Sequence, residues 1–480
     1  MDWRPNRNDK KPIYKQISEF IEGEITLGNY PPNSFLPSER ELAKLFSVNR
    51  STIVAAYDEL QASGLVHRAK GSGTKVNSDN WGLINKRIPN WNKYVAEGSF
   101  LPNFPIVQRL RQQTQDNDFI NLVSGELSSD LFPTENLQQI MSSSRFNESL
   151  GYAHPQGNEF LRNAISNHVK KYRSIATSPS SILITSGAQQ AIHLIVQGLL
   201  KPGDSIAIED PSYCFSLPLF RSAGLKIHYL PVGEKGIDPE DLLTLHSKHR
   251  IRMVFVNPDY QNPTGTVLSK SRRKYLLELS AKLGIPVIED DPYSLTAYNG
   301  EINPTLKSMD ENGNVLYISS LSKIVASGLR IGWIIGPRPV IERLADIKQQ
   351  VDFGHSVFPQ WIAGTFLSSD EFDTHIKMLR IKLEQRKNLL VTSLNKSLGD
   401  EIKLIKPKGG IHMWCKLNTI SDSNLLIETA LTKGVAFGPG NIFGTRKEFI
   451  RFTYGRCELE RIYDGVCRFK EAHKEVKRNI

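Results

Sequence analysis

The sequence predicts an α/β protein of two unequal parts. One is a small N-terminal module of helices and a hairpin; the other is a large domain with a mostly parallel sheet flanked by helices, plus a smaller α+β part. Residues 12–76 are dense with short helical patterns, whereas from about residue 118 short β-rich runs alternate with helical patterns. That alternation is typical of a parallel sheet. The chain of 480 residues also exceeds one ordinary core, since domains hold ~100–200 residues.

These shifts in pattern place the N-terminal module at residues 11–79, a linker at 80–117 and the large domain at 118–480. The linker contains tryptophans and prolines without a sustained period, which favours partial packing. Residues 81–117 hold five Lys and Arg against two Asp and Glu. A solvated basic tether is the preferred interpretation of that excess, and a supporting contact with DNA is the alternative.

The composition excludes several classes of protein. Hydrophobic residues make up 39% and charged residues 23%, which is typical of a globular chain. The four cysteines form no C-x-x-C pair, so neither a disulfide framework nor a zinc ribbon is expected. Apolar runs such as Ile192–Leu200 are far shorter than the ~20 residues of a membrane helix, and the N-terminus lacks the apolar segment of a signal peptide. We expect a soluble protein of the reducing cytoplasm.

The first two helices of the N-terminal module follow from apolar spacing and caps. The first is expected to end at Gly28 and the Pro31-Pro32 pair. Ser38 and Glu41 have the spacing of a capping box, which starts the second helix. The expected buried residues are Ile13, Ile17, Phe20, Ile21, Ile25 and Leu27 in the first helix, and Leu42, Leu45 and Phe46 in the second.

A third helix and a hairpin complete the module. Asn49 is the expected cap of a helix that buries Ile53, Ala56, Tyr57 and Leu60 and ends at Gly64. Two short strands then flank Gly71-Ser72-Gly73. Helix, helix, turn, helix and hairpin is the order of a winged helix-turn-helix.

This order indicates DNA binding through a local surface. Net charge is +10, but residues 1–80 hold eleven Lys and Arg against ten Asp and Glu, so bulk charge does not carry the argument. Arg50, Ser51 and Thr52 lie in the first turn of the third helix, which in this motif points into the major groove. Lys70 and Lys75 at the hairpin suit a neighbouring phosphate strand. A small helical docking module is the alternative.

The stretch from Pro12 to Val76 resembles the GntR-type winged helix over nearly its whole length. The specific parts are the run LPSEREL and the closing G-x-G-T. The resemblance implies that Arg40 and Arg50 contact DNA, while Val54 stands where some members carry a further basic residue. The expected DNA-binding residues are Arg40, Asn49, Arg50, Ser51, Thr52, Lys70, Gly71 and Gly73.

In the large domain, polar residues follow the predicted strands, and ligands of open α/β sheets bind at the carboxyl ends of strands. Ser186-Gly187-Ala188-Gln189 separates a strand from a helix, an arrangement that suits an anion. Tyr213 follows the next strand and can cover a flat ring or merely pack. Asn262, before a proline, can present its amide to a ligand oxygen.

Two further strand ends carry ionisable groups. Asp290 and Tyr293 follow one strand; Glu289, Asp290 and Asp291 together suggest magnesium, but no second acidic cluster of similar placement supports a metal, and none is expected. Lys323 follows another strand with Ser320 and Ser322, where an imine-forming lysine or a surface lysine fits. Arg330 is expected to open the strand RIGWIIG, where it can clamp a phosphate.

Together these groups match one ligand, pyridoxal 5′-phosphate (PLP). Its aldehyde needs a lysine, its pyridine nitrogen a carboxylate, its phenolic oxygen hydrogen-bond donors and its phosphate a cradle. Lys323, Asp290, Asn262 with Tyr293, and the Gly187–Arg330 region supply them. A buried Asp290 that faces a pyridinium is expected to stay charged.

Residues 118–480 resemble class-I aminotransferases of PLP fold type I. The matching runs are GYAHPQG, TSGAQQA, EDPSY, NPDYQNPTG, EDDPY, SSLSKIVASGLRIGW and RFTYG. The resemblance implies that Lys323 forms the internal aldimine with PLP, that Asp290 faces the pyridinium and that Tyr213 stacks on the ring. Asn262 and Tyr293 then approach the phenolic oxygen, Tyr152 reaches the phosphate of the other subunit and Arg451 binds an α-carboxylate. The implied phosphate residues are Gly187, Ala188, Ser320, Ser322 and Arg330.

The fusion of both halves resembles the MocR group of GntR-type regulators. That resemblance implies a homodimeric transcription factor whose aminotransferase-like domain senses PLP, or PLP with an amine or amino-acid effector. A working aminotransferase with an accessory DNA-binding head is the alternative. A PLP-binding scaffold in a protein complex is a third.

Overall fold

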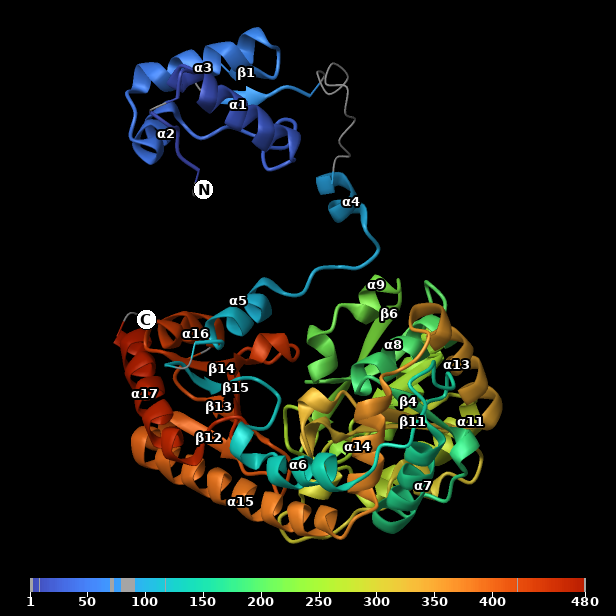
Figure 1. The fold of residues 1–480 in the computed structure, drawn as a ribbon. Helices are drawn as coiled ribbons and strands as arrows, with labels where there is room; N and C mark the ends of the chain where they lie inside the picture. The colour runs from blue at the N-terminus through green and yellow to red at the C-terminus, as the bar shows by residue number, and fades with distance from the viewer. Residues whose placement is uncertain are drawn as a thin grey trace. The chain divides into compact units, whose positions relative to one another are not determined.

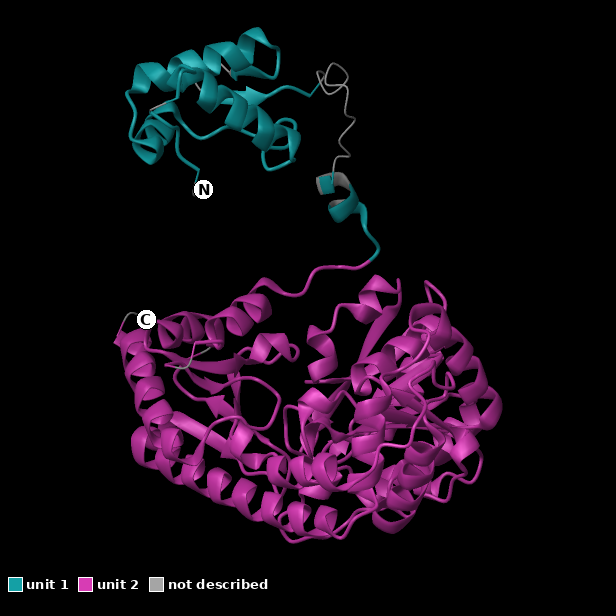
Figure 2. Cartoon of the chain, in the orientation of Figure 1, with its two compact units in different colours: residues 1–99 teal, residues 100–480 magenta. Residues whose placement is uncertain are grey.

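The computed structural model describes residues 3–7, 9–69, 73–78, 91–116, 118–420 and 422–478. The chain divides into two compact units, residues 1–99 and residues 100–480 (Figure 2). The predicted Lys70 and Gly71 lie outside the described residues, so the wing is described only by its two strands.

Unit 1 has the predicted order of elements. The helices are α1 (Ile13–Thr26), α2 (Glu39–Phe46) and α3 (Arg50–Ala62), and the antiparallel strands β1 (Val66–Ala69) and β2 (Gly73–Val76) form the hairpin. A short helix α4 (Trp91–Glu97) follows. The capping box is present, since Ser38 N–H donates to Glu41 Oε2 at 2.8 Å and Glu41 N–H donates to Ser38 Oγ at 3.3 Å. The winged helix-turn-helix prediction is confirmed for the part of unit 1 that the structure describes.

Three details of unit 1 differ from expectation. Leu27 is 71% exposed, because α1 ends at Thr26 and the chain leaves the apolar face through Gly28 in a left-handed conformation. Leu45 is 43% exposed, because α2 turns only Leu42 and Phe46 to the core. Asn49 occupies the N-cap position of α3, yet its side chain makes no capping hydrogen bond.

Unit 2 is built on two sheets. The large sheet has the order β4-β11-β10-β9-β8-β5-β6-β7, and only β11 and β7 run against the others. Its strands are β4 (Ile182–Thr185), β5 (Ser205–Asp210), β6 (Lys226–Gly233), β7 (Gly236–Ile237), β8 (Met253–Val256), β9 (Val287–Asp290), β10 (Val315–Ser320) and β11 (Gly332–Ile335). The second sheet has the order β12-β13-β15-β14-β3, with β3 (Ile120–Leu122), β12 (Ile402–Ile405), β13 (His412–Leu417), β14 (Val435–Pro439) and β15 (Phe449–Thr453).

Helices cover both faces of the large sheet, as the predicted fold class requires (Figure 1). Ile206 and Ala207, neighbours in β5, pack into different apolar clusters because successive side chains of a strand point to opposite faces. The helices of unit 2 are α5 (Pro105–Gln113), α6 (Thr134–Ser143), α7 (Glu159–Arg173), α8 (Ala188–Leu199), α9 (Leu219–Ser222), α10 (Pro239–His249), α11 (Lys270–Leu283), α12 (Leu306–Met309), α13 (Arg338–Val351), α14 (Val357–Leu367), α15 (Glu371–Leu398), α16 (Ser423–Thr432) and α17 (Ile462–Arg478). Across the described ranges, we find no helix with the length and apolar character of a membrane span.

A buried ionic cluster lies beneath the large sheet's carboxyl edge. Arg173 contacts Asp259 at 3.1 Å and Asp291 at 2.9 Å, and Arg273 contacts Asp259 at 2.6 Å. Glu289 accepts hydrogen bonds from the first backbone amides of α12, at 2.8 Å each. The three consecutive acidic residues 289–291 therefore have different partners, since Asp290 accepts a hydrogen bond from the Tyr213 hydroxyl.

Candidate functional sites

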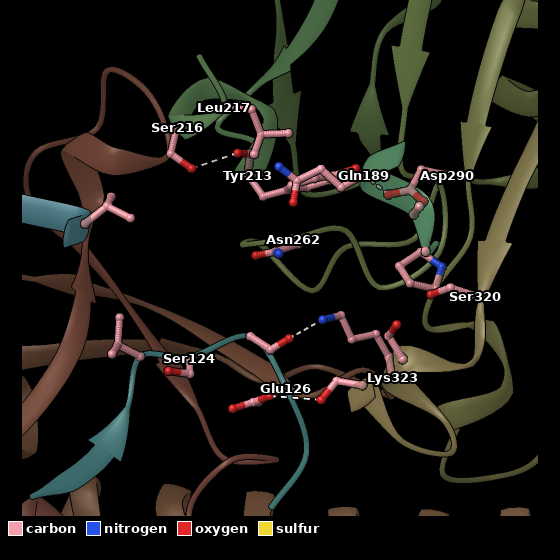
Figure 3. Close-up of a pocket in the computed structure, with 18 of the residues that line it drawn as sticks. Ser124, Glu126, Gln189, Tyr213, Ser216, Leu217, Asn262, Asp290, Ser320 and Lys323 are labelled. Atoms are coloured by element: carbon pink, nitrogen blue, oxygen red, sulfur yellow. Dashed lines mark hydrogen bonds between the residues drawn. The ribbon is translucent and has the colours of Figure 1, made fainter. Parts of the chain in front are cut away.

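A cavity of about 480 Å³ lies at the carboxyl edge of the large sheet. Eleven of the twelve residues that the sequence predicted for the cofactor and the effector line it: Gly187, Ala188, Tyr213, Asn262, Asp290, Tyr293, Ser320, Ser322, Lys323, Arg330 and Arg451. The twelfth, Tyr152, lies elsewhere. Figure 3 shows Asn262 between the side that carries Tyr213 and the side that carries Lys323.

Sheet register explains why these residues meet. Ser320 pairs with Gly332, and Gly332 pairs with Thr185, so the end of β10, the start of β11 and the end of β4 lie side by side. A Cβ at Gly332 would stand 2.7 Å from the Gly187 Cα, so only glycine allows this approach. The prediction that Arg330 opens a strand is wrong: it precedes β11 in a left-handed turn with φ 53°, and this turn directs its side chain toward β4.

One end of the cavity is suited to a phosphate. Gly187 is the N-cap of α8 with φ 85°, and Ala188 and Gln189 of the first turn line the cavity, so the positive end of the helix dipole lies beside it. Arg330 NH2 donates to the Ser186 carbonyl at 2.5 Å, which holds the guanidinium beside this turn. Ser320 and Ser322 add hydroxyl groups to the same wall.

Asp290 supplies the deep end of the cavity with a carboxylate. Its Oδ2 accepts a hydrogen bond from the Tyr213 hydroxyl at 2.6 Å, whereas its buried Oδ1 has no hydrogen-bond partner among the described residues (Figure 3). Burial raises the Asp290 pKa to about 6, although the Tyr213 hydrogen bond opposes the shift. A pyridinium N–H is the kind of donor that this unsatisfied oxygen lacks, so the residues present fit the pyridine ring of PLP.

Asn257, which the sequence reasoning missed, fixes two of the predicted residues. Its side-chain amide donates to the Asp290 carbonyl at 2.8 Å, and its Oδ1 accepts from the Asn262 backbone N–H at 2.9 Å. The buried Asn257 thus joins the ends of β8 and β9. Its place directly after the strand RMVFV indicates a site residue, but of this run only Asn262 was predicted from the sequence.

Lys323 lies across the cavity from Asp290. Its Nζ donates to the Gly125 carbonyl, next to Glu126, on the loop that follows β3 (Figure 3). Burial lowers the Lys323 pKa to about 8, and the Glu126 carboxylate opposes this shift. A lysine with this pKa holds a larger fraction of nucleophilic neutral amine near pH 8 than an exposed lysine does.

Arg451 is a buried guanidinium that faces the cavity. It donates to Asn262 Oδ1 at 2.8 Å and to the Val123 carbonyl at 2.5 Å, and it lies 4.4 Å from the centroid of the Phe443 ring. Burial lowers the Arg451 pKa to about 10. Within the described ranges no carboxylate pairs with it, so its guanidinium is suited to an anionic ligand group.

A chain of hydrogen bonds reaches the cavity through Tyr293. Thr453 Oγ1 donates to the Val123 carbonyl at 3.3 Å and therefore accepts from His412 Nδ1 at 3.0 Å. His412 Nε2 is then the acceptor for the Tyr293 hydroxyl at 3.1 Å. Burial lowers the His412 pKa well below its usual value, which keeps the imidazole neutral. No sequence pattern had pointed to His412.

Unit 1 gathers three of its predicted DNA-binding residues around one shallow cavity of about 260 Å³. Arg40 from α2, Arg50 from α3 and Gly73 from the wing line it together with Ser38. Arg50 donates to Glu39 Oε2 from Nε at 2.9 Å and from NH2 at 2.8 Å, so the arginine is held in one orientation. Asn49, Ser51 and Thr52 occupy the cap and first turn of α3.

Tyr152 belongs to an exposed apolar area of unit 2. It is 89% exposed, and its ring centroid lies 5.8 Å from that of Phe353. Phe146, close to Tyr152 in sequence, stacks on the half-exposed Phe358, which is close to Phe353 in sequence. The exposed apolar residues of these segments are Met141, Leu150, Tyr152, Val351, Phe353 and Phe358.

The cavity and its sheet define the class of protein: a domain of the PLP fold type I, here preceded by a winged helix. Residues 117–464 match the profile of aminotransferase class I and II, and residues 13–76 match that of the bacterial regulatory proteins of the gntR family. The chain belongs to the aminotransferase class I and II family, with a gntR-type module at its N-terminal side.

Full-length relatives share both parts. The HTH-type transcriptional regulator YdfD of Bacillus subtilis is 41% identical over 95% of each chain. The HTH-type transcriptional regulator NorG of Staphylococcus aureus is 30% identical over 92% of this chain and 100% of its own. Among solved structures, a kynurenine aminotransferase of Pyrococcus horikoshii in complex with PMP has a TM-score of 0.75 and 29% identity over 82% of this chain and 99% of its own.

Proposed function

We propose that this protein is a PLP-dependent transcriptional regulator of the MocR type. Unit 1 binds DNA, and unit 2 senses PLP or PLP together with an amine or amino acid. The observation that carries the proposal is the combination, in one chain, of a winged helix with clustered arginines and a cavity whose groups fit PLP. Similarity to YdfD and NorG over nearly the whole chain supports it. Because the proposed partner is DNA, we also propose the cytoplasm as its compartment.

In this proposal the exposed edge of unit 1 reads DNA. Arg40 and Arg50 bind phosphates or base edges, and the first turn of α3 enters the major groove. The Glu39 carboxylate restricts the Arg50 side chain before DNA arrives, so less side-chain entropy is lost on binding. Asn49 is available for a DNA contact because it makes no capping bond.

In unit 2, bound PLP supplies an electrophilic aldehyde and an electron-withdrawing pyridinium ring. Lys323 would provide the amine for the aldehyde, and Asp290 Oδ1 would accept a hydrogen bond from the N–H of the ring. Gly187, Ala188, Ser320, Ser322 and Arg330 hold the phosphate. Asn262 and Tyr293 face the phenolic oxygen, and Arg451 orients the carboxylate of an amino acid.

We also propose that two copies form a homodimer through the apolar area around Tyr152. An exposed apolar area on a protein commonly marks an interaction surface. Closure of two such areas would bury Leu150, Phe353 and Phe358 and bring Tyr152 toward the partner's site. A DNA-binding dimer then presents two heads to paired half-sites.

Selection of genomic fragments with the PLP-loaded protein tests the regulator function. We expect a few intergenic sites with paired half-sites, and the adjacent genes then indicate the effector. Recovery of random fragments that are released by modest salt would contradict sequence-specific regulation, since such binding is electrostatic.

An active aminotransferase is the second candidate, and the complete set of cavity residues favours it. Multiple-turnover transamination between an amino donor and a 2-oxo acid distinguishes the two functions. Sustained turnover without specific DNA sites would establish the enzyme. A single half-reaction fits either function.

A further inference from the structure

Helix α5 forms part of the wall of the unit-2 cavity. Val107, Leu110 and Arg111 line the cavity beside the residues that suit the cofactor. The chain leaves unit 2 toward unit 1 through the residues just before this helix. The element that closes one side of the cavity is therefore also the element through which unit 2 is covalently joined to the DNA-binding unit.

Segment 100–113 holds on to both halves of unit 2. On the side of the large sheet, Leu101 N–H donates to Ser222 Oγ at 2.9 Å, and the Phe104 ring lies 4.9 Å from the Arg221 guanidinium. On the side of the second sheet, Arg109 pairs with Glu428 of α16 at 2.6 Å. Figure 1 shows α5 beside α16 and the preceding segment running toward α9.

Packing links α5 to the guanidinium that suits a carboxylate. Val107 packs against the apolar cluster that contains Phe443, and the Phe443 ring lies 4.4 Å from the Arg451 guanidinium. Leu110 is buried in the main core and also reaches the cavity. The cavity that Arg451 faces is also lined by the apolar side chains of Val107, Leu110, Leu217 and Ile442, and by Arg111 of the same helix.

We propose that α5 recognises the side chain of the effector and transmits cavity occupancy to the connector, and that the effector is an α-amino acid with an apolar side chain. The proposal rests on the proposed sensor function and deepens it. Apolar groups at this wall contribute little to an amino acid without a side chain but bury surface against a branched aliphatic one. If the effector binds more tightly when α5 is in one position, its binding shifts α5, and with it the connector, toward that position.

The test compares L-leucine with glycine on the full-length PLP-loaded protein, because the two share amine and carboxylate and differ in the side chain. Binding is followed by the absorbance change of the bound cofactor. Binding to a selected genomic fragment is followed by fluorescence anisotropy. We compare the wild type with Val107→Ala/Leu110→Ala, with Val107→Phe and with the control Gln108→Ala, whose side chain is exposed on the same helix.

We expect the wild type to bind leucine more tightly than glycine by about tenfold or more, the scale at which an apolar pocket discriminates. The double alanine variant loses this ratio and the leucine-dependent change in DNA affinity, and Val107→Phe weakens leucine with little effect on glycine. Gln108→Ala behaves as the wild type.

Three results would overturn the inference in distinguishable ways. A wild type that does not prefer leucine to glycine excludes the apolar class. An unchanged leucine-to-glycine ratio in both Val107 variants excludes recognition by α5, while effector-dependent DNA binding would leave the sensor function intact. A DNA affinity that no amino acid alters in the wild type, despite tight leucine binding, excludes transmission and the amino-acid sensor itself.

Discussion

The two units place their candidate functional groups in opposite environments. In unit 1, Arg40 and Arg50 are exposed, and Arg50 is oriented by its ion pair with Glu39. In unit 2, Asp290 and Arg451 are buried. Burial raises the pKa of Asp290 and lowers the pKa of Arg451, so it favours the neutral form of each. A DNA surface needs charges that stay in water until the polyanion arrives, whereas a small-ligand site uses groups whose missing partners the ligand supplies.

The largest expected effect is confined to unit 2 and concerns Lys323. Lys323→Ala removes the only amine that we assign to the aldehyde of PLP, so borohydride reduction should no longer fix cofactor to the protein, as mass spectrometry would show. The exposed Lys403→Ala is the control and keeps the label. Covalent label on the Lys323→Ala protein would contradict the assignment.

Asp290→Asn is expected to weaken PLP binding by about 2 kcal/mol, roughly thirtyfold, because a charged acceptor in a buried hydrogen bond is lost. Equilibrium titration monitored by cofactor absorbance measures it. Asn262→Asp, which changes the charge at another residue of the cavity, is the control. An equal loss of PLP affinity in this variant would show that any change in local charge has the effect expected for Asp290→Asn.

Asp290→Asn is expected to stabilise the cofactor-free fold, although it weakens PLP binding. Since burial raises the Asp290 pKa from 3.8 to about 6, the folded protein holds this proton more tightly than the unfolded chain does. The contribution of Asp290 to stability therefore falls as pH rises from about 4 to about 6 and stays low above that range. Asp290→Asn should raise the melting temperature of the cofactor-free protein more at about pH 7.5 than at about pH 5. An equal change at both pH values would contradict the shift.

In unit 1, Arg40→Ala and Arg50→Ala are each expected to weaken DNA binding by about tenfold. Each should also lower the slope of log affinity against log salt concentration by about 1 if it contacts a phosphate. Anisotropy titrations at several salt concentrations measure both quantities. Lys15→Ala, an exposed charge on α1, serves as the control; a loss as large as that of the arginines would indicate binding by bulk charge.

The smallest effect concerns the cap of α2. Ser38→Ala removes a capping acceptor worth about 1 kcal/mol. Hydrogen exchange of the Glu41 amide should accelerate by roughly fivefold, while the cofactor absorbance of unit 2 stays unchanged. Equal acceleration in the α8 amides would show that the two units are coupled in stability.

Local patterns predicted elements in both units, but not the helices α4 and α5, which lie within the range expected to be a linker. The capping box, the buried face of α3 and the strand ends with Asp290, Asn262 and Lys323 all depend on neighbours in sequence, and all are present. The assigned roles of the cavity residues stay predictions, although the fold brings eleven of them to one place.

The remaining features depend on distant partners, which periodicity does not report. Leu45 has the spacing of a core residue, but it is 43% exposed, since none of the elements that the structure describes covers it. Arg330 adjoins a strand in sequence, yet contact with Ser186 fixes its turn. His412 lies beside Thr453 because β13 pairs with β15, which the sequence alone does not report. Likewise, α5 forms a wall of the cavity only when both halves of unit 2 are folded.

The buried ionic cluster of Arg173, Asp259, Arg273 and Asp291 constrains how this sequence can change over time. Among the described residues, the members pair with one another, and Arg273 also lies 3.9 Å from Glu289, so loss of one leaves a poorly compensated charge in the core, at a cost of about 3–5 kcal/mol. Single substitutions are therefore expected to be eliminated, whereas simultaneous replacement by apolar residues is tolerable. Among descendants of this sequence, the four positions should be inherited as a set.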